Sequence, residues 1–136
     1  MTTRAFTVPG KPISKGRPRF ARGGHTFTDK RTQLAEANIR DSYLRAHDGS
    51  ALLTGALVVV ITATFEIPAS WAKKKRAAAL DGSLPHVSRP DLDNVAKAVL
   101  DALNGIAFAD DAQIVHLLCD KGYGETAGTY VSLREE

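Results

Sequence analysis

The order of hydrophobic and polar residues along the chain predicts short strands and three helices. Residues 5–8 alternate weakly and predict a first strand, and a short, irregular hairpin is expected to turn near Gly23. From Lys30 to about His47 apolar residues recur every three or four positions, which indicates a helix. Thr28 or Asp29 would serve as the N-cap of that helix.

The stretch GALVVVITATFEI, residues 55–67, is apolar and β-branched nearly throughout. It predicts a central strand that is buried on both of its faces. Residues 68–80 predict a short helix with its proline near the start. Residues 81–90 are rich in glycine and proline and predict a loop.

A third helix is expected from about Asp91 to Leu103. Counted from Leu92, its apolar residues fall at i, i+3, i+7, i+8 and i+11, which places them on one face. Asn104 and Gly105 are typical of the C-terminal end of a helix.

The last two apolar stretches, residues 112–124 and 128–135, predict a closing antiparallel pair of strands joined around Glu125. Together the elements predict an α+β (mixed α/β) fold in a single domain, residues 1–136. We expect a mixed, mainly antiparallel sheet packed by two or three helices.

The composition is that of a globular domain, with 43% hydrophobic and 24% charged residues. The longest apolar stretch, residues 56–65, is about half the ~20 residues that a membrane-spanning helix needs, so no membrane contact is expected. The N-terminus lacks the apolar segment of an export signal. Cys119 is the only cysteine, which excludes an internal disulfide and favours a small buried residue over a nucleophile. These features predict a cytoplasmic protein.

The net charge of +3 conceals an uneven distribution. Residues 1–31 hold eight Lys or Arg and one acid, whereas residues 91–136 hold nine acids and three Lys or Arg. Such an asymmetry can be an accident of the surface. It is also what a polyanion-binding arm joined to a cation-binding site would produce.

Acidic residues lie at both ends of the third predicted helix: Asp91 and Asp93 at its start, Asp110 and Asp111 after it. Capping and the helix dipole explain one aspartate at the start, but not all four. If the chain doubles back after the helix, these carboxylates approach one another and repel unless a cation neutralises them. Mg²⁺ prefers such hard oxygen ligands, and Mn²⁺ is a possible substitute.

Other ligand-binding motifs fit the sequence poorly. An EF-hand that starts at Asp91 would need Gly at Ala96 and Glu at Ala102. The chain has neither a phosphate-binding P-loop motif nor a dinucleotide-binding glycine motif. The single cysteine and the scattered histidines lack the spacing of a zinc site.

Lys97 lies four residues after Asp93 and four before Asp101, so the three share a stripe away from the apolar face. The spacing alone fits a surface ladder of ion pairs. Alternatively, the ammonium of Lys97 stabilises a phosphate beside the metal. With a basic arm, the carboxylates then indicate metal-dependent phosphodiester hydrolysis, which the pattern favours only modestly over an acidic surface patch.

The stretch DLDNVAKAVLDALNG…FADDAQI resembles the signature of the RusA family of Holliday-junction resolvases. The shared positions are the Asp-x-Asp-Asn start, the lysine six residues after the first aspartate, Leu-Asp-Ala-Leu and Asp-Asp-x-Gln. The segments VPGKPISKGRPRF and SWAKKKR are also similar to parts of the phage and prophage branch, so the resemblance covers most of the chain. The stretch between the predicted helix and the Asp-Asp pair is one residue shorter in this chain than in the family pattern. The N-terminal half of the chain departs more from that pattern.

The resemblance implies a homodimeric, Mg²⁺-dependent endonuclease that resolves four-way DNA junctions by two symmetric nicks in recombination and repair. It implies Asp91, Asp93 and Asp111 as metal ligands and Lys97 as a catalytic or phosphate-contacting group. It also implies a bacterial, phage or prophage origin. The alternatives are an architectural protein of the same fold that binds junctions without cutting, and an acid-patch interaction protein.

Basic residues in two segments are candidate DNA-phosphate contacts, although a solvated surface explains them as well. Phe20 and Phe27 could stack on unpaired bases, but packing in the protein is the favoured interpretation. His86 could assist proton transfer, yet an exposed loop histidine is favoured. The candidate DNA-binding residues are Lys15, Arg17, Arg19, Arg22, Lys73, Lys74, Lys75 and Arg76.

Overall fold

The computed structural model describes residues 1–13, 19–20, 26–27 and 30–136, with only the backbone described at 19–20 and 26–27. Its helices and strands follow one another in an order close to that expected from the sequence. They are β1 (Thr2–Pro9), β2 (Arg19–Phe20), β3 (Thr26–Phe27), α1 (Lys30–Ala46), β4 (Leu57–Glu66), α2 (Lys73–Leu80), α3 (Leu92–Leu103), the single 3₁₀ turn η1 (Asp111–Gln113), β5 (Ile114–Gly124) and β6 (Gly128–Glu135).

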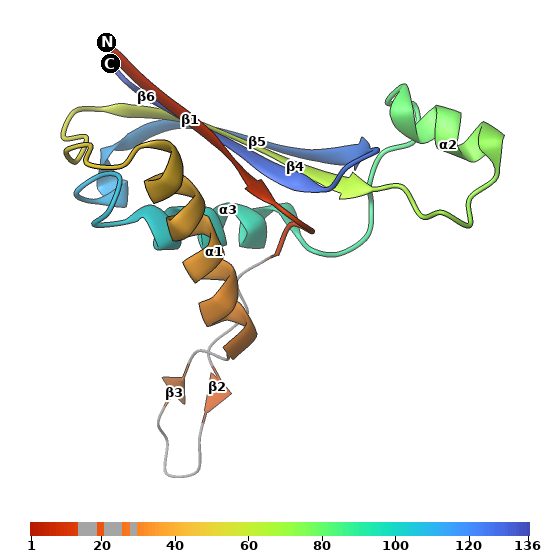
Figure 1. Cartoon of the computed structure of the whole chain (residues 1–136), viewed down its shortest axis with the longest axis horizontal. Helices are drawn as coiled ribbons and strands as arrows, with labels where there is room; N and C mark the ends of the chain where they lie inside the picture. Colours follow the sequence, from red (N-terminus) through yellow and green to blue (C-terminus); the bar gives the residue numbers. More distant parts are fainter. Residues whose placement is uncertain (14–18, 21–25, 28–29) are drawn as a thin grey trace.

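Four strands form one sheet in the order β1-β6-β4-β5. The pairs β1–β6 and β6–β4 are antiparallel, and β4–β5 is parallel. The two ends of the chain lie side by side, since Thr2 pairs with Glu135 (Figure 1). A mixed, mainly antiparallel sheet with helices confirms the predicted α+β class.

The predicted antiparallel pairing of the last two strands is wrong. β5 and β6 are joined by a short turn, but β4 lies between them and pairs with both. β4 is a strongly apolar strand, and pairing on both edges satisfies the backbone groups along most of its length. β5 reaches β4 through the crossover that contains α2 and α3, and such a crossover gives a parallel neighbour.

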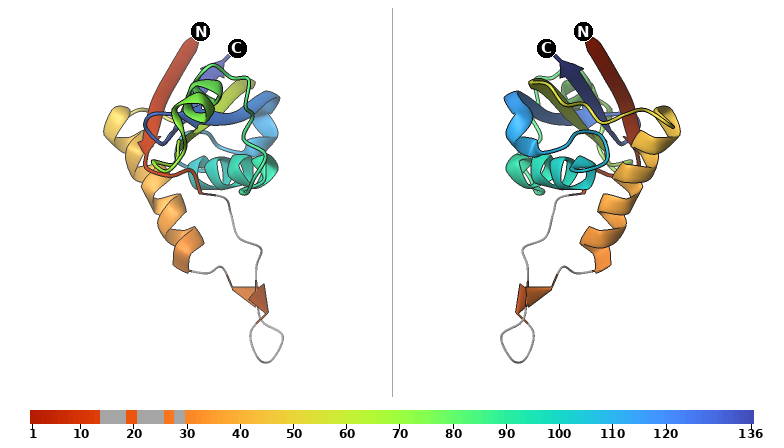
Figure 2. Two further views of the ribbon diagram at one scale, coloured as in Figure 1. Left: turned by 90° about the vertical axis from the view of Figure 1, so that its right-hand side faces the viewer. Right: turned by 90° about the vertical axis from the view of Figure 1, so that its left-hand side faces the viewer.

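One face of the sheet is covered by helices. Alternate residues of β4, among them Leu57, Val59 and Ile61, are fully buried, whereas the residues between them are half-buried. The prediction that this strand is buried on both faces is therefore wrong, since α1 and α3 pack on a single side (Figure 2).

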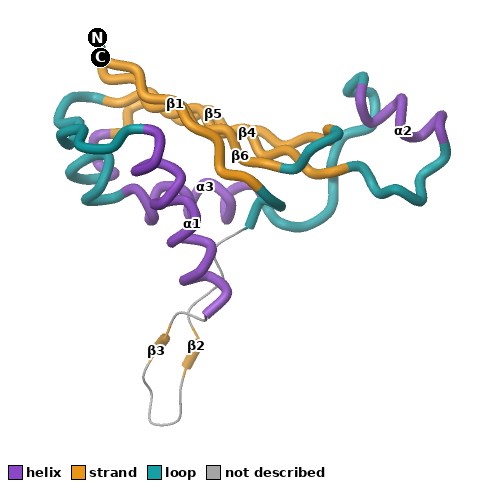
Figure 3. Tube along the Cα trace, viewed as in Figure 1, coloured by secondary structure: helices purple, strands orange, loops and turns teal. Residues whose placement is uncertain are grey.

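The helices differ in how well the sequence located them. α1 and α3 agree with the prediction to within a residue, whereas α2 begins only at Lys73. α2 stands apart from the other two helices, with a loop at each of its ends (Figure 3). β2 and β3 pair antiparallel, which confirms the hairpin. Its expected turn at Gly23 and the expected N-caps Thr28 and Asp29 lie outside the described residues.

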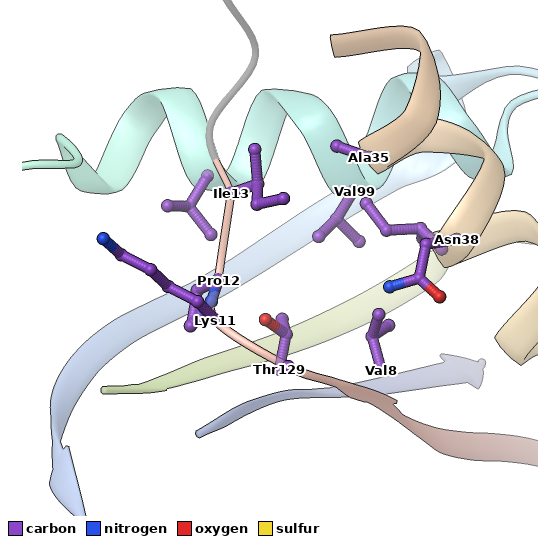
Figure 4. Close-up of a pocket in the computed structure, with 11 residues that line it drawn as sticks. Val8, Lys11, Pro12, Ile13, Ala35, Asn38, Val99 and Thr129 are labelled. Carbon is purple, nitrogen blue, oxygen red and sulfur yellow. The ribbon is translucent and has the colours of Figure 1, made fainter. Parts of the chain in front are cut away.

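The segment that follows β1 crosses between the sheet and the two large helices. Ile13 packs there beside Val99 and Ala35 around a small cavity of about 20 Å³. Figure 4 shows the side chain of Lys11 pointing away from these apolar residues, so its ammonium group lies at the protein surface.

Candidate active site

The first two candidate aspartates are placed by the start of α3. Val95, Val99 and Leu103 are buried, so this face of the helix packs on the core and Asp93 and Lys97 remain exposed. Asp91 is the N-cap residue, in an extended conformation with φ −67° and ψ 141°. Within the described part of the chain its carboxylate makes no capping hydrogen bond, which leaves it available to a ligand.

The turn that carries Asp110 and Asp111 is held by Gln113. The Nε2 of Gln113 donates to the carbonyl oxygens of Leu53 (3.0 Å) and Gly55 (2.9 Å), and its Oε1 accepts from the backbone N–H of Asp110 (2.8 Å). Asp110 in turn caps η1, because its carboxylate accepts from the N–H of Ala112 at 3.4 Å. Asp110 therefore has a structural task, and the Asp111 side chain is left to face α3.

Asp93, Lys97 and Asp111 line one open hollow of about 400 Å³, which we call the acidic hollow. Asp101 lines it as well, and Leu117 of β5 forms part of its wall. The chain thus doubles back after α3 as the sequence predicted, and α3, η1 and β5 each contribute to the hollow.

One carboxyl of the acidic hollow, that of Asp111, holds its proton more tightly than usual. The pKa of Asp111 is raised, first by a hydrogen bond with the Asp110 carboxyl, then by partial burial and by the negative charges of Asp110 and Asp101. Crowded carboxylates of this kind are stabilised by a cation. A bound cation would oppose this shift, because it favours the ionised form of the carboxyl.

Asp91 lines a neighbouring hollow of about 220 Å³, which we call the linking hollow. Lys11, Arg31 and Arg89 lie there too, and Asn94 lines both this hollow and the acidic one. The structure brings Asp93, Lys97 and Asp111 together in the acidic hollow. It places Asp91 in the adjoining linking hollow, one helical turn before Asn94. Cations therefore surround the first candidate ligand.

Among residues 1–13 and 30–136, no three acidic, histidine or cysteine side chains are gathered closely enough to hold a metal by themselves. Mg²⁺ needs no such cage, since it is commonly bound by one or two carboxylates, with waters and substrate phosphates completing its octahedron. The paired acids Asp93 and Asp111 fit that mode of binding, with Asp91 at the adjoining edge. The metal assignment stays a prediction.

The basic candidates divide into two groups. Lys15, Arg17 and Arg22 lie outside the described residues, as do the side chains of Arg19, Phe20 and Phe27. On α2, Lys73 and Lys74 are exposed, whereas Lys75 places its Nζ 4.0 Å from the centre of the Trp71 ring and Arg76 donates to the Pro68 carbonyl at 3.2 Å. Two of these four cations therefore also stabilise the loop before α2.

The structure corrects one expectation in the loop before α3. His86 is not exposed, since only 7% of its surface is accessible. Its ring stacks on Phe65 with 4.0 Å between centroids. Burial, and next the positive charge of Lys121, lower the pKa of His86, so it is neutral at physiological pH.

Sequence reasoning assigned no role to Gln113 or Lys121. The Nζ of Lys121 donates to the carbonyl oxygens of Ser88 (2.7 Å) and Pro90 (3.0 Å), which fixes the segment that leads into Asp91. Gln113 could have been suspected from its place in the Asp-Asp-x-Gln motif. No local signal marks Lys121, because its partners are 31 and 33 residues away in the sequence.

The whole sequence was compared with protein families and with known proteins. The family model described as Endodeoxyribonuclease RusA matches residues 9–134. The chain is also 33% identical over 137 residues to the uncharacterized protein YqaN of Bacillus subtilis (strain 168), which covers 96% of this chain and 94% of that one. In the described part of the structure no helix is both long and apolar enough to cross a membrane. The chain therefore belongs to the RusA endodeoxyribonuclease family.

Proposed function

We propose that this protein is a Mg²⁺-dependent, structure-selective endonuclease that resolves Holliday junctions by paired, symmetric cleavage of two DNA strands. Its family membership supports nuclease action on DNA junctions. The observation that carries the proposal is the acidic hollow, where Asp93, Asp111 and Lys97 converge from different elements.

In this proposal Asp93 and Asp111 hold the metal ion, with Asp91 at its edge. Mg²⁺ bound there would activate water for attack and neutralise charge on the oxygens of the phosphodiester. Lys97 lines the same hollow, and its ammonium would stabilise the negative charge that develops on the scissile phosphate. Asp101 adds negative charge that strengthens the attraction for a cation.

The cations of the linking hollow position the DNA backbone. Lys11, Arg31 and Arg89 border Asp91, and phosphate contacts of this kind fix register and orientation rather than sequence. The exposed Lys73 and Lys74 of α2 would extend the same positive surface.

Symmetric cutting of a two-fold junction further requires two active sites, and we propose a homodimer formed along β5. β5 lies at the edge of the sheet and exposes Val115, Leu117 and Leu118 with 56%, 47% and 62% of their surfaces accessible. An open apolar edge strand favours pairing with another strand, and a two-fold axis makes that pairing self-complementary. Because Leu117 belongs to β5 and also lines the acidic hollow, each acidic hollow would lie close to the dimer interface.

The dimer is tested by light scattering after size exclusion. Leu118→Lys should give a monomer, while Leu34→Lys, at an equally exposed leucine of α1, should leave the mass unchanged. A wild-type chain that is monomeric at micromolar concentration would contradict the proposed dimer.

One gel tests the function itself. A labelled four-way junction and a linear duplex of the same sequence are incubated with the protein, with and without Mg²⁺. We expect symmetric nicks in the junction only, and only with Mg²⁺. Salt-dependent binding without nicks would instead indicate the architectural protein, and the absence of any DNA binding would indicate an acid-patch interaction protein.

A further inference from the structure

A third and larger hollow lies where the parallel strands β4 and β5 end, next to the loop that leads into α2. Figure 1 shows how these strand ends and this loop are arranged. Its volume of about 700 Å³ falls within the range of roughly 300–1,000 Å³ that is usual for small-molecule sites. Aromatic side chains form its wall: Phe65, Trp71, His86 and Tyr123. We call it the aromatic hollow.

The rings of the aromatic hollow are already arranged by contact with one another. His86 is stacked on Phe65 and lies 5.0 Å from Tyr123, and Tyr123 lies 5.2 Å from Trp71 in an edge-to-face orientation (all centroid to centroid). Trp71 and Tyr123 are only half-buried, so part of each ring remains available to a ligand. Lys75 lies over one face of the Trp71 ring, so a flat aromatic guest would use the remaining accessible parts of the Trp71 and Tyr123 rings.

His86 also carries an unused polar group. Its Nδ1 is buried and has no hydrogen-bond partner within the described part of the chain. The residue as a whole is also buried, since only 7% of its surface is accessible. Buried polar atoms are nearly always paired in folded proteins. Because the protein encloses this nitrogen, a ligand in the hollow would contact the accessible parts of the Trp71 and Tyr123 rings instead.

Two cations connect this hollow to the candidate active site. Lys11 and Arg89 line both the aromatic hollow and the linking hollow, and Arg89 is two residues before Asp91. Lys121 fixes the same segment through the carbonyls on either side of Arg89. A path therefore leads from the aromatic rings, past two positive charges, to the aspartates.

We infer that the aromatic hollow binds an unstacked nucleobase of the DNA strand whose phosphates contact Lys11 and Arg89. This inference rests on the proposed function and adds a base-binding position to it. Aromatic side chains bind unpaired bases by stacking, with little sequence preference, while neighbouring cations follow the backbone. A purely apolar ligand would make no use of the two cations, and an intact duplex offers no free base.

Trp71 is the only tryptophan of the chain, so its fluorescence reports on the aromatic hollow directly. The full-length protein is titrated in EDTA, which prevents cleavage, with a four-way junction, a single strand, a duplex of the same sequence and deoxyadenosine monophosphate. We expect saturable quenching by the junction and the single strand, weaker quenching by the duplex, and little response to the mononucleotide, which lacks a second phosphate for the paired cations.

Variants give a second measurement. Trp71→Ala and Tyr123→Ala should each weaken junction binding by roughly ten- to hundredfold, because each removes a stacking surface. Tyr130→Ala is the control, since Tyr130 is an exposed tyrosine on β6 that lies on the opposite face of the sheet from Tyr123. Circular dichroism and thermal unfolding establish that each variant is folded.

Failure of this inference is distinguishable from failure of the proposed function. Unchanged Trp71 emission at DNA concentrations that saturate binding would overturn the base-binding position, whatever the cleavage assay shows. Equal quenching by the mononucleotide and the single strand would assign the hollow to free nucleotides and likewise overturn it. Quenching by the junction with no cleavage in Mg²⁺ would support the base-binding position and reject the nuclease.

Discussion

The acidic hollow and the aromatic hollow are joined by residues 88–91, and they are built in opposite ways. In the acidic hollow Asp93, Lys97 and Asp111 are exposed, and their backbone is fixed from beneath by α3 and Gln113. In the aromatic hollow the side chains fix one another, at centroid distances of 4.0 to 5.2 Å.

This difference separates two tasks. Carboxylates that bind a metal must be free to exchange contacts with water, the ion and a phosphate, and they repel one another unless a cation neutralises them. A surface that receives a base gains most when it is already assembled, because little ordering is then needed on binding. We therefore expect the acidic hollow to govern the rate of cleavage and the aromatic hollow to govern affinity.

The largest expected effect comes from Asp93→Asn. Loss of one of the carboxylates that we propose to bind the metal should lower the rate of junction cleavage by about 10³-fold, since metal ions contribute several kcal/mol to transition-state stabilisation. Junction affinity in EDTA should be unchanged or higher, because a negative charge has been removed. Single-turnover cleavage and gel-shift titration measure the two quantities.

Asp41→Asn is the matched control, as Asp41 is an exposed aspartate on α1, outside all three hollows. Its cleavage rate should be that of the wild type. If Asp93→Asn cleaved at the wild-type rate, the division of tasks between the hollows would be lost together with the metal assignment.

The next effect in size is expected for Lys97→Ala. Removal of a cation that stabilises developing charge should lower the rate at saturating DNA by about 10²-fold. Lys97→Arg should restore part of the rate, since it keeps the charge but not the shape. Lys74→Ala, an exposed lysine of α2, should instead lower affinity and its salt dependence while the saturated rate is kept.

Gln113→Leu tests how the acidic hollow is held. The substitution removes three hydrogen bonds at nearly constant size, two of them part-buried and one exposed, and should destabilise the fold by about 1–2 kcal/mol, since two carbonyl oxygens in part-buried positions lose their donor. Urea denaturation measures this loss. Cleavage should fall by about tenfold through displacement of Asp111, whereas quenching of Trp71 by DNA should be unchanged.

If Gln113→Leu lost DNA binding to the same extent as cleavage, the two hollows would not be independent. The turn of Asp110 and Asp111 would then support the whole end of the sheet, and the two hollows would form a single cooperative site.

The contrast between the hollows also explains what the sequence could predict. α3 and its acids were found because a helical repeat is local: Leu92 to Leu103 give the face, and Asp93 and Lys97 follow from spacing. The return of Asp111 toward α3 required only a short turn. The Asp-Asp-x-Gln motif identified the same turn through resemblance, without a role for its glutamine.

The aromatic hollow was missed because its residues come together only through the sheet. Phe65 and Tyr123 are neighbours because β4 and β5 pair in parallel, and the sequence predicted β5 beside β6 instead. The same error concealed the contact of Lys121 with the loop before α3. His86 was predicted to be exposed for a similar reason, since a loop with glycine and proline gives no indication of the ring that will cover it.

The smallest effect is expected at Glu135, which supports the acidic hollow from a distance. Its carboxylate accepts from the backbone N–H groups of Thr54 and Gly55, both at 2.9 Å, and the carbonyl of Gly55 in turn accepts from Gln113. These two hydrogen bonds, that from Gly55 being the stronger influence, lower the pKa of Glu135. A lowered pKa in the folded state means that the ionised carboxylate stabilises the fold, and that this contribution disappears as pH falls through the folded-state pKa.

Glu135→Gln should therefore unfold at a slightly lower temperature than the wild type at every pH above about 5, where an unfolded glutamate is ionised. The difference should shrink as the pH falls below that value and vanish in stronger acid, because the wild-type side chain is then neutral as well. Thermal unfolding followed across this range measures the convergence. Glu125→Gln, an exposed glutamate in the turn after β5, should show no such convergence. A constant difference between Glu135→Gln and the wild type down to strong acid would show that shape rather than charge at Glu135 holds Gly55, and hence Gln113, beneath the acidic hollow.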